Sequence, residues 1–230
     1  GTYNPNSSSN SSAACMNATA GHYVDGAGSA SQTACTAGTY NPSNGSNSSA
    51  ACLVTPAGNY SESAAAAPIQ CPVGTWQDQS GQSSCMNATA GHYVDGAGSA
   101  SQTACTAGTY NPNSSSNSSA ACLVTPAGNY SLEGASSPTL CAPGTWQDQT
   151  GQSSCIDASA GHYASGSGST SETACSPGSY QPNTGQSSCI QASSGYYVDT
   201  NGSTSQTPCS PGTYNPNSSS NSSSDCIDVP

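Results

Sequence analysis

The chain has 230 residues, of which only 15 are Leu, Ile or Val, and it contains no Phe. This is well below the share of roughly one-fifth found in globular sequences, so the chain cannot bury the core that a conventional enzyme fold needs. Lys and Arg do not occur and the formal net charge is −11, which excludes nucleic-acid binding because that binding depends on cations that neutralise phosphates. No apolar run approaches the roughly 18 residues of a membrane-spanning helix, so no membrane insertion is expected in this segment.

Thirteen cysteines are spread from Cys15 to Cys226, and no two of them are closer than 14 residues. Zinc sites use cysteine pairs only a few residues apart, so this spacing gives no sign of zinc. Regularly spaced cysteines in a chain rich in Ser, Gly and Asn indicate disulfides and therefore an oxidising, extracellular setting. A secreted protein starts with a signal peptide, so we expect this sequence to be a window of a longer chain.

The chain reads as one tandem array over residues 1–230. Residues 15–84 and 85–154 are near-identical super-repeats of 70 residues, with 57 identical positions, and residues 155–230 continue the same units in shortened order. Tandem repeats of this kind stack in one dimension. We therefore expect an elongated, disulfide-stapled rod that is mostly irregular, with short β-hairpins and almost no helix.

Each unit of about 17 residues carries the pattern Gly-x-aromatic. A Pro or Ala often precedes the Gly, and Pro-Gly favours a type II turn in which Gly takes the position with positive φ. The aromatic residue is then expected to start a short extended segment. The aromatic residues in this pattern are Tyr3, Tyr23, Tyr40, Tyr60, Trp76, Tyr93, Tyr110, Tyr130, Trp146, Tyr163, Tyr180, Tyr197 and Tyr214.

The cysteines stand alternately three and six residues before the Gly, as in Cys35-Thr-Ala-Gly38 and Cys15-Met-Asn-Ala-Thr-Ala-Gly21. With the polar stretch Gly-Gln-Ser-Ser before a cysteine, this pattern resembles the ephrin-receptor-like cysteine-rich repeat, itself similar to the first loop of TNF-receptor modules. The segments 71–85 and 175–189 fit it well. This chain keeps one of the family's two neighbouring cysteines, because Ala18 and Gln32 stand where the other would be.

The resemblance implies that the cysteine near the Gly bonds to the cysteine that follows. Cys15 would then pair with a cysteine upstream of the window. A competing pattern, beginning with Cys15–Cys35 and Cys52–Cys71, would instead leave Cys226 free. The pairs implied by the resemblance are Cys35–Cys52, Cys71–Cys85, Cys105–Cys122, Cys141–Cys155, Cys175–Cys189 and Cys209–Cys226.

Asn-x-Ser/Thr sequons are frequent, and in an extracellular chain they are acceptors for N-linked glycans. Ser and Thr in the same tracts are candidates for O-linked sugars. Covalent glycans are therefore expected, and no cofactor is. The sequons are at Asn6, Asn10, Asn17, Asn44, Asn47, Asn59, Asn87, Asn113, Asn117, Asn129, Asn201, Asn217 and Asn221.

No catalytic or metal-binding residues are predicted. His22, His92 and His162 occupy one position of the unit, where the fourth equivalent is Tyr196; a metal ligand would not tolerate that exchange. The acidic residues are scattered singly, without the converging oxygens that calcium requires. No Gly-x-Ser-x-Gly elbow or placed triad occurs.

These observations favour a secreted, cell-surface, structural glycoprotein whose repeats self-associate into a fibre or filament. Near-identical units present the same surface repeatedly, so a favourable contact is multiplied along the array. The alternative is the stalk of an adhesion or receptor-like surface protein. Neither reading is an enzyme.

Overall fold

The computed structural model describes residues 1–9 and 11–230. Contacts between Cα atoms divide the chain into two compact units. The first unit contains residues 1–105 and 111–121, and the second contains residues 106–110 and 122–230. Within the described residues, each unit is built from antiparallel hairpins with two strands of two residues each.

The strands of the first unit are β1 (Thr2–Tyr3) with β2 (Met16–Asn17), β3 (His22–Tyr23) with β4 (Thr33–Ala34), β5 (Thr39–Tyr40) with β6 (Leu53–Val54), β7 (Asn59–Tyr60) with β8 (Ile69–Gln70), β9 (Thr75–Trp76) with β10 (Met86–Asn87), and β11 (His92–Tyr93) with β12 (Thr103–Ala104). Those of the second unit are β13 (Thr109–Tyr110) with β14 (Leu123–Val124), β15 (Asn129–Tyr130) with β16 (Thr139–Leu140), β17 (Thr145–Trp146) with β18 (Ile156–Asp157), β19 (His162–Tyr163) with β20 (Thr173–Ala174), β21 (Ser179–Tyr180) with β22 (Ile190–Gln191), β23 (Tyr196–Tyr197) with β24 (Thr207–Pro208), and β25 (Thr213–Tyr214) with β26 (Ile227–Asp228).

Helical structure in the described part of the chain is limited to four 3₁₀ turns, η1 (Ser12–Ala14), η2 (Ser49–Ala51), η3 (Ser119–Ala121) and η4 (Ser223–Asp225). None of the described helices has the length and apolar composition to cross a membrane. The expected fold, a repeat of short hairpins with almost no helix, is confirmed.

Every Gly-x-aromatic motif forms the first strand of a hairpin. In β5 the turn before the strand is closed by the N–H of Thr39, which donates to the carbonyl of Thr36 at 3.0 Å. Gly38 takes the third position of this turn with φ 85°, as a type II turn requires. The aromatic Tyr40 then pairs with Leu53 across the hairpin.

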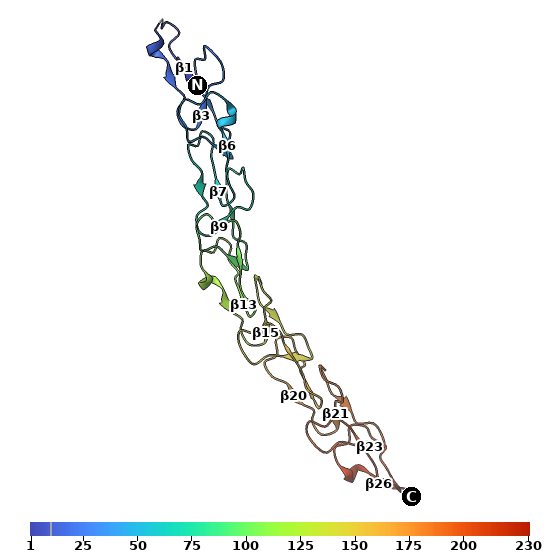
Figure 1. The fold of residues 1–230 in the computed structure, drawn as a ribbon. Helices are drawn as coiled ribbons and strands as arrows, with labels where there is room; N and C mark the ends of the chain where they lie inside the picture. Colours follow the sequence, from blue (N-terminus) through green and yellow to red (C-terminus); the bar gives the residue numbers. More distant parts are fainter. Residues whose placement is uncertain (10) are drawn as a thin grey trace. The chain divides into compact units, whose positions relative to one another are not determined.

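Successive hairpins are joined by main-chain hydrogen bonds. The glycine that opens a hairpin donates its N–H to the carbonyl of the residue after the aromatic in the next hairpin, as from Gly58 to Gln77 at 2.7 Å. The hairpin that Gly58 opens makes a second bond of this kind. Its own residue after the aromatic, Ser61, donates its N–H to the carbonyl of Gln82 in the loop of the next hairpin at 3.1 Å. Figure 1 follows this succession of hairpins along each unit by colour.

A second set of bonds joins hairpins to the hairpin after the next. The carbonyl of Cys71, which follows β8, accepts the N–H of Gly98 in the loop of β11–β12 at 2.8 Å. At the same contact, a Cβ on Gly58 would overlap the carbonyl oxygen of Gly98. Glycine is therefore required at this position both by its positive φ and by the close approach of a neighbouring backbone.

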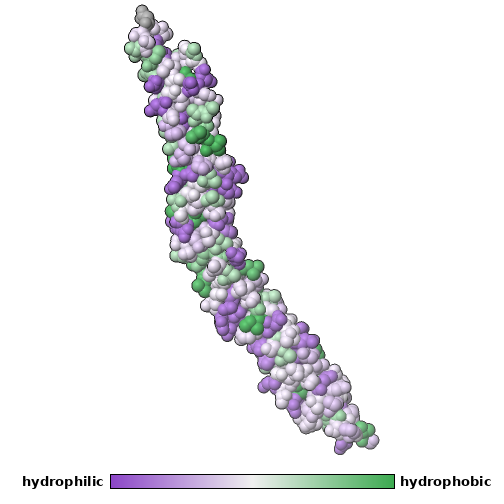
Figure 2. Space-filling view, in the orientation of Figure 1, coloured by the Kyte–Doolittle hydropathy of each residue, from purple (hydrophilic) through white to green (hydrophobic). Residues whose placement is uncertain are grey.

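The units have no central hydrophobic core. The buried residues recur mainly at three positions of the hairpin: the turn glycine, the position after the aromatic and the position after the second strand. Many of them are polar, and the Leu and Ile side chains are exposed. Figure 2 shows the same result from outside, as small separate hydrophobic patches among polar ones. Hydrogen bonds and disulfides therefore hold the units together, with little apolar burial per hairpin.

Candidate functional site

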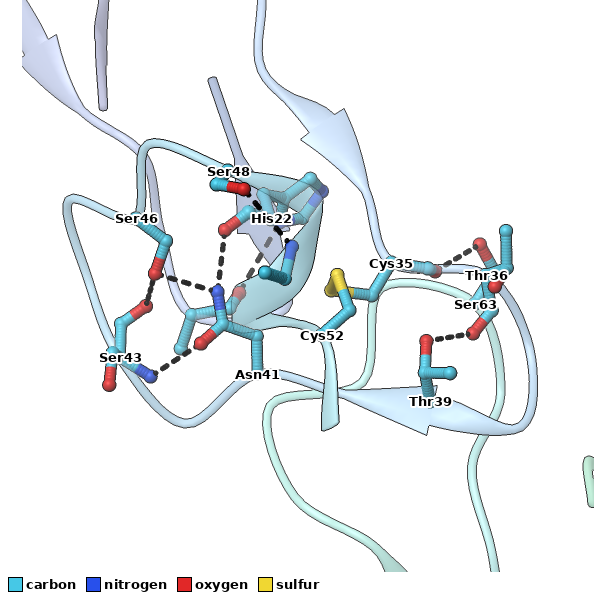
Figure 3. The surroundings of a disulfide bond; sticks show 12 residues. His22, Cys35, Thr36, Thr39, Asn41, Ser43, Ser46, Ser48, Cys52 and Ser63 are labelled. Carbon is cyan, nitrogen blue, oxygen red and sulfur yellow. Dashed lines mark hydrogen bonds between the residues drawn. A yellow bond between two sulfur atoms is a disulfide. The ribbon is translucent and has the colours of Figure 1, made fainter. Parts of the chain in front are cut away.

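The repeating element with the most distinct chemistry is the hairpin closed by a disulfide (Figure 3). In β5–β6 the disulfide joins Cys35, three residues before the turn glycine, to Cys52, which directly precedes β6. The bond clamps the two ends of the hairpin, with Cα atoms 5.6 Å apart. Cys35 is 1% exposed, so the first half-cystine belongs to the interior of the stack.

Five pairs implied by the family resemblance are present in the structure. The closed hairpins are those with the pairs Cys35–Cys52, Cys71–Cys85, Cys141–Cys155, Cys175–Cys189 and Cys209–Cys226. Cys105 and Cys122, which flank β13–β14, are also disulfide-bonded. Cys15 is exposed and its thiol is free.

Closed hairpins alternate with open ones, in which the two half-cystine positions hold other residues. Residues at the first position, such as Ala18 and Thr55, are as fully buried as the cysteines they replace. In four open hairpins the second position holds Gln or Glu, whose side-chain oxygen accepts the backbone N–H next to the first position. These pairs are Gln32 with Thr19 at 2.8 Å, Gln102 with Thr89 at 2.8 Å, Glu172 with Ser159 at 2.6 Å and Gln206 with Ser193 at 2.7 Å. A hydrogen bond thus takes the place of the disulfide.

This equivalence predicts that a disulfide can be introduced into an open hairpin. We expect the double variant Ala158→Cys, Glu172→Cys to form a disulfide, because β19–β20 has the same register as the closed hairpin β21–β22. A closed loop of this length contributes roughly 3 kcal/mol. Intact-mass analysis before and after reduction detects the bond, and hydrogen exchange at Cys175 measures the stabilisation; two free thiols in the folded variant would contradict the equivalence.

A buried asparagine organises the loop of the closed hairpin β5–β6 (Figure 3). Asn41 is 1% exposed. Its Nδ2 donates to the carbonyl of His22 in the preceding hairpin at 2.8 Å and to Oγ of Ser46 at 2.9 Å. Its Oδ1 accepts the N–H of Ser43 at 3.0 Å. Asn111 and Asn215 make the same contacts in their hairpins.

Replacing Asn41 by Leu should destabilise β5–β6. The change leaves the His22 carbonyl and the Ser43 N–H without their partners in a buried site, which costs about 1–3 kcal/mol. The exposed side chain of Ser43 makes no such bond, so Ser43→Ala should change stability by less than about 0.5 kcal/mol. Hydrogen exchange at residue 41 and at Cys52 compares the two variants; equal protection in both would show that the amide network is dispensable.

The sequons lie mostly at the surface. Ten of the thirteen asparagines are exposed. Asn59 and Asn129 are half-buried, and their Nδ2 atoms donate to the carbonyls of Ala57 and Ala127. Asn10 lies outside the described residues. Glycans on the exposed asparagines would point into solvent.

The histidines are separated by whole repeats, and each one is half-buried within its own hairpin. The Nδ1 of His22 lies 3.2 Å from Oγ1 of Thr19 and 3.3 Å from the carbonyl oxygen of Ala20. Among the described residues, no three His, Cys, Asp or Glu side chains gather where they could hold a metal ion.

The sequence did not reveal the role of the residue after the aromatic. This position is buried in nearly every hairpin and both donates and accepts the bonds between hairpins. One signal was available, because in the closed hairpins the residue type at this position follows the separation of the two half-cystines. The position holds Asn where the separation is 17 residues, as at Asn41 and Asn111, and Gln where it is 14, as at Gln77, Gln147 and Gln181. The longer amide spans the shorter loop to reach a carbonyl beside the second half-cystine, as from Gln77 to Ser84 at 3.0 Å.

Two segments of this chain match a family model. Residues 58–105 and residues 128–175 match the family model described as "Tyrosine-protein kinase ephrin type A/B receptor-like". Each matched segment holds two open hairpins with a closed hairpin between them. A comparison with curated proteins found no match. The chain therefore contains two ephrin-receptor-like cysteine-rich repeats, which are non-catalytic modules typical of the extracellular regions of surface proteins.

Proposed function

We propose that this chain is a structural segment of a glycosylated extracellular fibre. The observation that carries the proposal is the continuity of the main-chain bonding within each unit. Within each unit, successive hairpins are bonded to one another, and the carbonyl of the residue after a second strand also bonds to the loop of the hairpin after the next, as between Cys71 and Gly98 and between Cys175 and Gly202. Such nearest-neighbour bonding is how repeat proteins extend without a limit set by a core.

Disulfides make this stack resistant to extension. A closed hairpin cannot lengthen beyond its 14- or 17-residue loop while its disulfide is intact. In the described units closed hairpins alternate with open ones, so an extending force meets a covalent clamp at every second hairpin. This arrangement suits a material that carries load outside the cell, where disulfides persist.

The charge of the chain bears on how copies would associate. The chain has eleven Asp and Glu side chains and no Lys or Arg to balance their charge. Nine of these eleven residues are exposed. Bare copies therefore repel one another when they lie side by side. Sugars on the exposed asparagines would separate these charges and supply neutral hydrogen-bonding groups, and a contact between unlike faces that does not close propagates into a filament.

Imaging of the native protein tests this proposal. The full-length protein, purified with its glycans, is examined by electron microscopy and by light scattering over a range of concentrations. We expect filaments with an axial repeat set by the hairpins, and loss of filaments after enzymatic removal of the glycans. A strictly monomeric protein that binds one defined soluble ligand would overturn the proposal and favour the stalk of an adhesion or receptor-like protein.

A further inference from the structure

The same surface recess occurs beside three closed hairpins. The recesses have volumes of about 200, 310 and 380 Å³ and lie beside the disulfides Cys35–Cys52, Cys71–Cys85 and Cys175–Cys189. The first two are in the first unit and the third is in the second unit. Equivalent residues form all three, so the recess recurs with the repeat at these hairpins.

Four positions of the repeat line each recess. They are the tyrosine of the preceding open hairpin, the residue after the first half-cystine, the hydroxyl residue that begins the next strand, and the second half-cystine. In the three recesses these positions hold Tyr23, Thr36, Thr39 and Cys52; Tyr60, Pro72, Thr75 and Cys85; and Tyr163, Ser176, Ser179 and Cys189. Figure 3 shows Thr36 and Thr39 near the Cys35–Cys52 disulfide.

Hydroxyl groups are the polar side chains that all three recesses share; Glu62 lines the second recess and Gln191 the third in addition. The strand hydroxyl of Thr39, Thr75 or Ser179 donates within the turn to the carbonyl of Thr36, Pro72 or Ser176, at 2.7, 2.7 and 2.8 Å. This bond fixes the rotamer and leaves lone pairs that can accept from a ligand. A serine directly before the second half-cystine adds a further hydroxyl, that of Ser84 or Ser188. Neither of these two serine hydroxyls bonds to any other residue that the structure describes.

The tyrosine gives the recess an apolar wall. Tyr23, Tyr60 and Tyr163 are half-buried, so each ring retains exposed surface beside the hydroxyls. A small recess that combines an aromatic ring with hydroxyl donors and acceptors fits a ligand with both an apolar face and a rim of hydroxyls. A pyranose ring has these two features, since its axial C–H bonds form an apolar face and its hydroxyls lie around the edge.

We propose that these recesses bind neutral hexopyranose units of a polysaccharide without forming a covalent bond. The charge of the chain favours neutral sugars: it has no Lys or Arg and a net charge of −11, so it repels sulfated or uronic sugars. The repetition of the recess along the chain favours a polymer as the ligand. Binding at several recesses of one chain raises the overall affinity, because the sugars of one polymer are present at a high effective concentration after the first has bound.

The experiment uses the full chain with its disulfides formed and its own N-glycans removed. Neutral glucose and mannose oligosaccharides of increasing length are titrated while amide chemical shifts are followed by NMR. We expect shifts at Ser176, Ser179 and Ser188 that share one binding curve, and tighter binding with longer oligosaccharides. Sulfated oligosaccharides and an uncharged peptide serve as the competing ligand classes.

Two variants and one matched control make the test specific. Tyr163→Val removes the apolar wall, and Ser188→Ala removes an unpartnered hydroxyl; each should weaken binding at this recess by about fivefold or more. Tyr180→Val makes the same exchange in the strand of the closed hairpin, outside the recess lining, and should leave binding unchanged. Free-thiol counts confirm that all three variants keep their disulfides.

The proposal is overturned if no neutral oligosaccharide shifts the recess amides, if Tyr180→Val weakens binding as much as Tyr163→Val, or if sulfated sugars or the peptide bind more tightly. These outcomes are independent of whether the native protein forms fibres, because sugar binding is measured on the dispersed chain.

Discussion

Replacing Gly161 by Ala should abolish the stack around β19–β20. Gly161 has φ 83°, and a Cβ there would overlap the carbonyl oxygen of Gly202 two hairpins further on. The substitution strains the turn by roughly 1–2 kcal/mol and also forces apart two backbones that side-chain movement cannot separate. We expect a total loss above about 4 kcal/mol, beyond the range of most single substitutions. Hydrogen exchange at residue 161 and at Ala164 measures it, because both N–H groups donate to the next hairpin.

Gly195 provides a matched control for this substitution. It also opens an open hairpin and has φ 84°, but nothing lies within 4 Å of the Cβ that Ala would add. Gly195→Ala should therefore cost only the strain of roughly 1–2 kcal/mol from positive φ. If the two variants lose the same amount of stability, the close approach of the Gly202 carbonyl to Gly161 is not what requires glycine at position 161.

Removing the disulfide of β9–β10 should open that hairpin while the more distant hairpins of the first unit persist. The double variant Cys71→Ser, Cys85→Ser releases a loop closed over 14 residues, which costs roughly 3 kcal/mol. Cys71 is also completely buried, so the new hydroxyl adds the cost of an interior polar group. We expect fast hydrogen exchange at Gly74 and Ala88 and slow exchange in hairpins further along the first unit, because repeat proteins open locally.

The free cysteine serves as the control for this variant. Cys15 is exposed and unbonded in the structure. Cys15→Ser should therefore change the free energy of opening, measured by hydrogen exchange, by less than about 0.5 kcal/mol. If the Cys71 and Cys85 double variant keeps wild-type protection at Gly74, the disulfide is not needed to keep this hairpin folded. The main-chain hydrogen bonds within and between hairpins would then be sufficient.

The hairpins could be predicted because their signals are local. Gly38 sets a turn and Tyr40 begins an extended segment. Both signals span only a few residues and act through backbone conformation. Which loops are closed followed only from the resemblance to the ephrin-receptor-like repeat, because the residues alone left two pairing patterns open. The low aliphatic content also excluded a central core correctly, since burial in both units is limited to small contacts within and between hairpins.

The bonding between hairpins could not be predicted from the same signals. The contact of Gly58 with Gly98 joins residues 40 positions apart, and nothing in either local sequence specifies the other. The buried Asn41 reads locally as a turn residue, because Asn is common in turns; only the His22 carbonyl beside it reveals its role between hairpins. Likewise, Gln32 occupies the place of a missing cysteine in the sequence, and its bond to Thr19 appears only in three dimensions.

Site-resolved hydrogen exchange on the native chain tests the central claim most directly, namely that each hairpin is held by main-chain bonds to the hairpins that follow it. The claim predicts slow exchange at the N–H groups that bond to a later hairpin, including Gly58, Ser61 and Gly161, and fast exchange at exposed loop residues such as Asp78 and Asp148, whose N–H groups make no bond with the described residues. Because the Gly58 and Gly161 bonds end on the next hairpin, their protection should fall together with that hairpin when its disulfide is removed. Fast exchange at Gly58, Ser61 and Gly161 in the oxidised chain would contradict the account, since it would mean that the hairpins are separate clamps without a continuous stack.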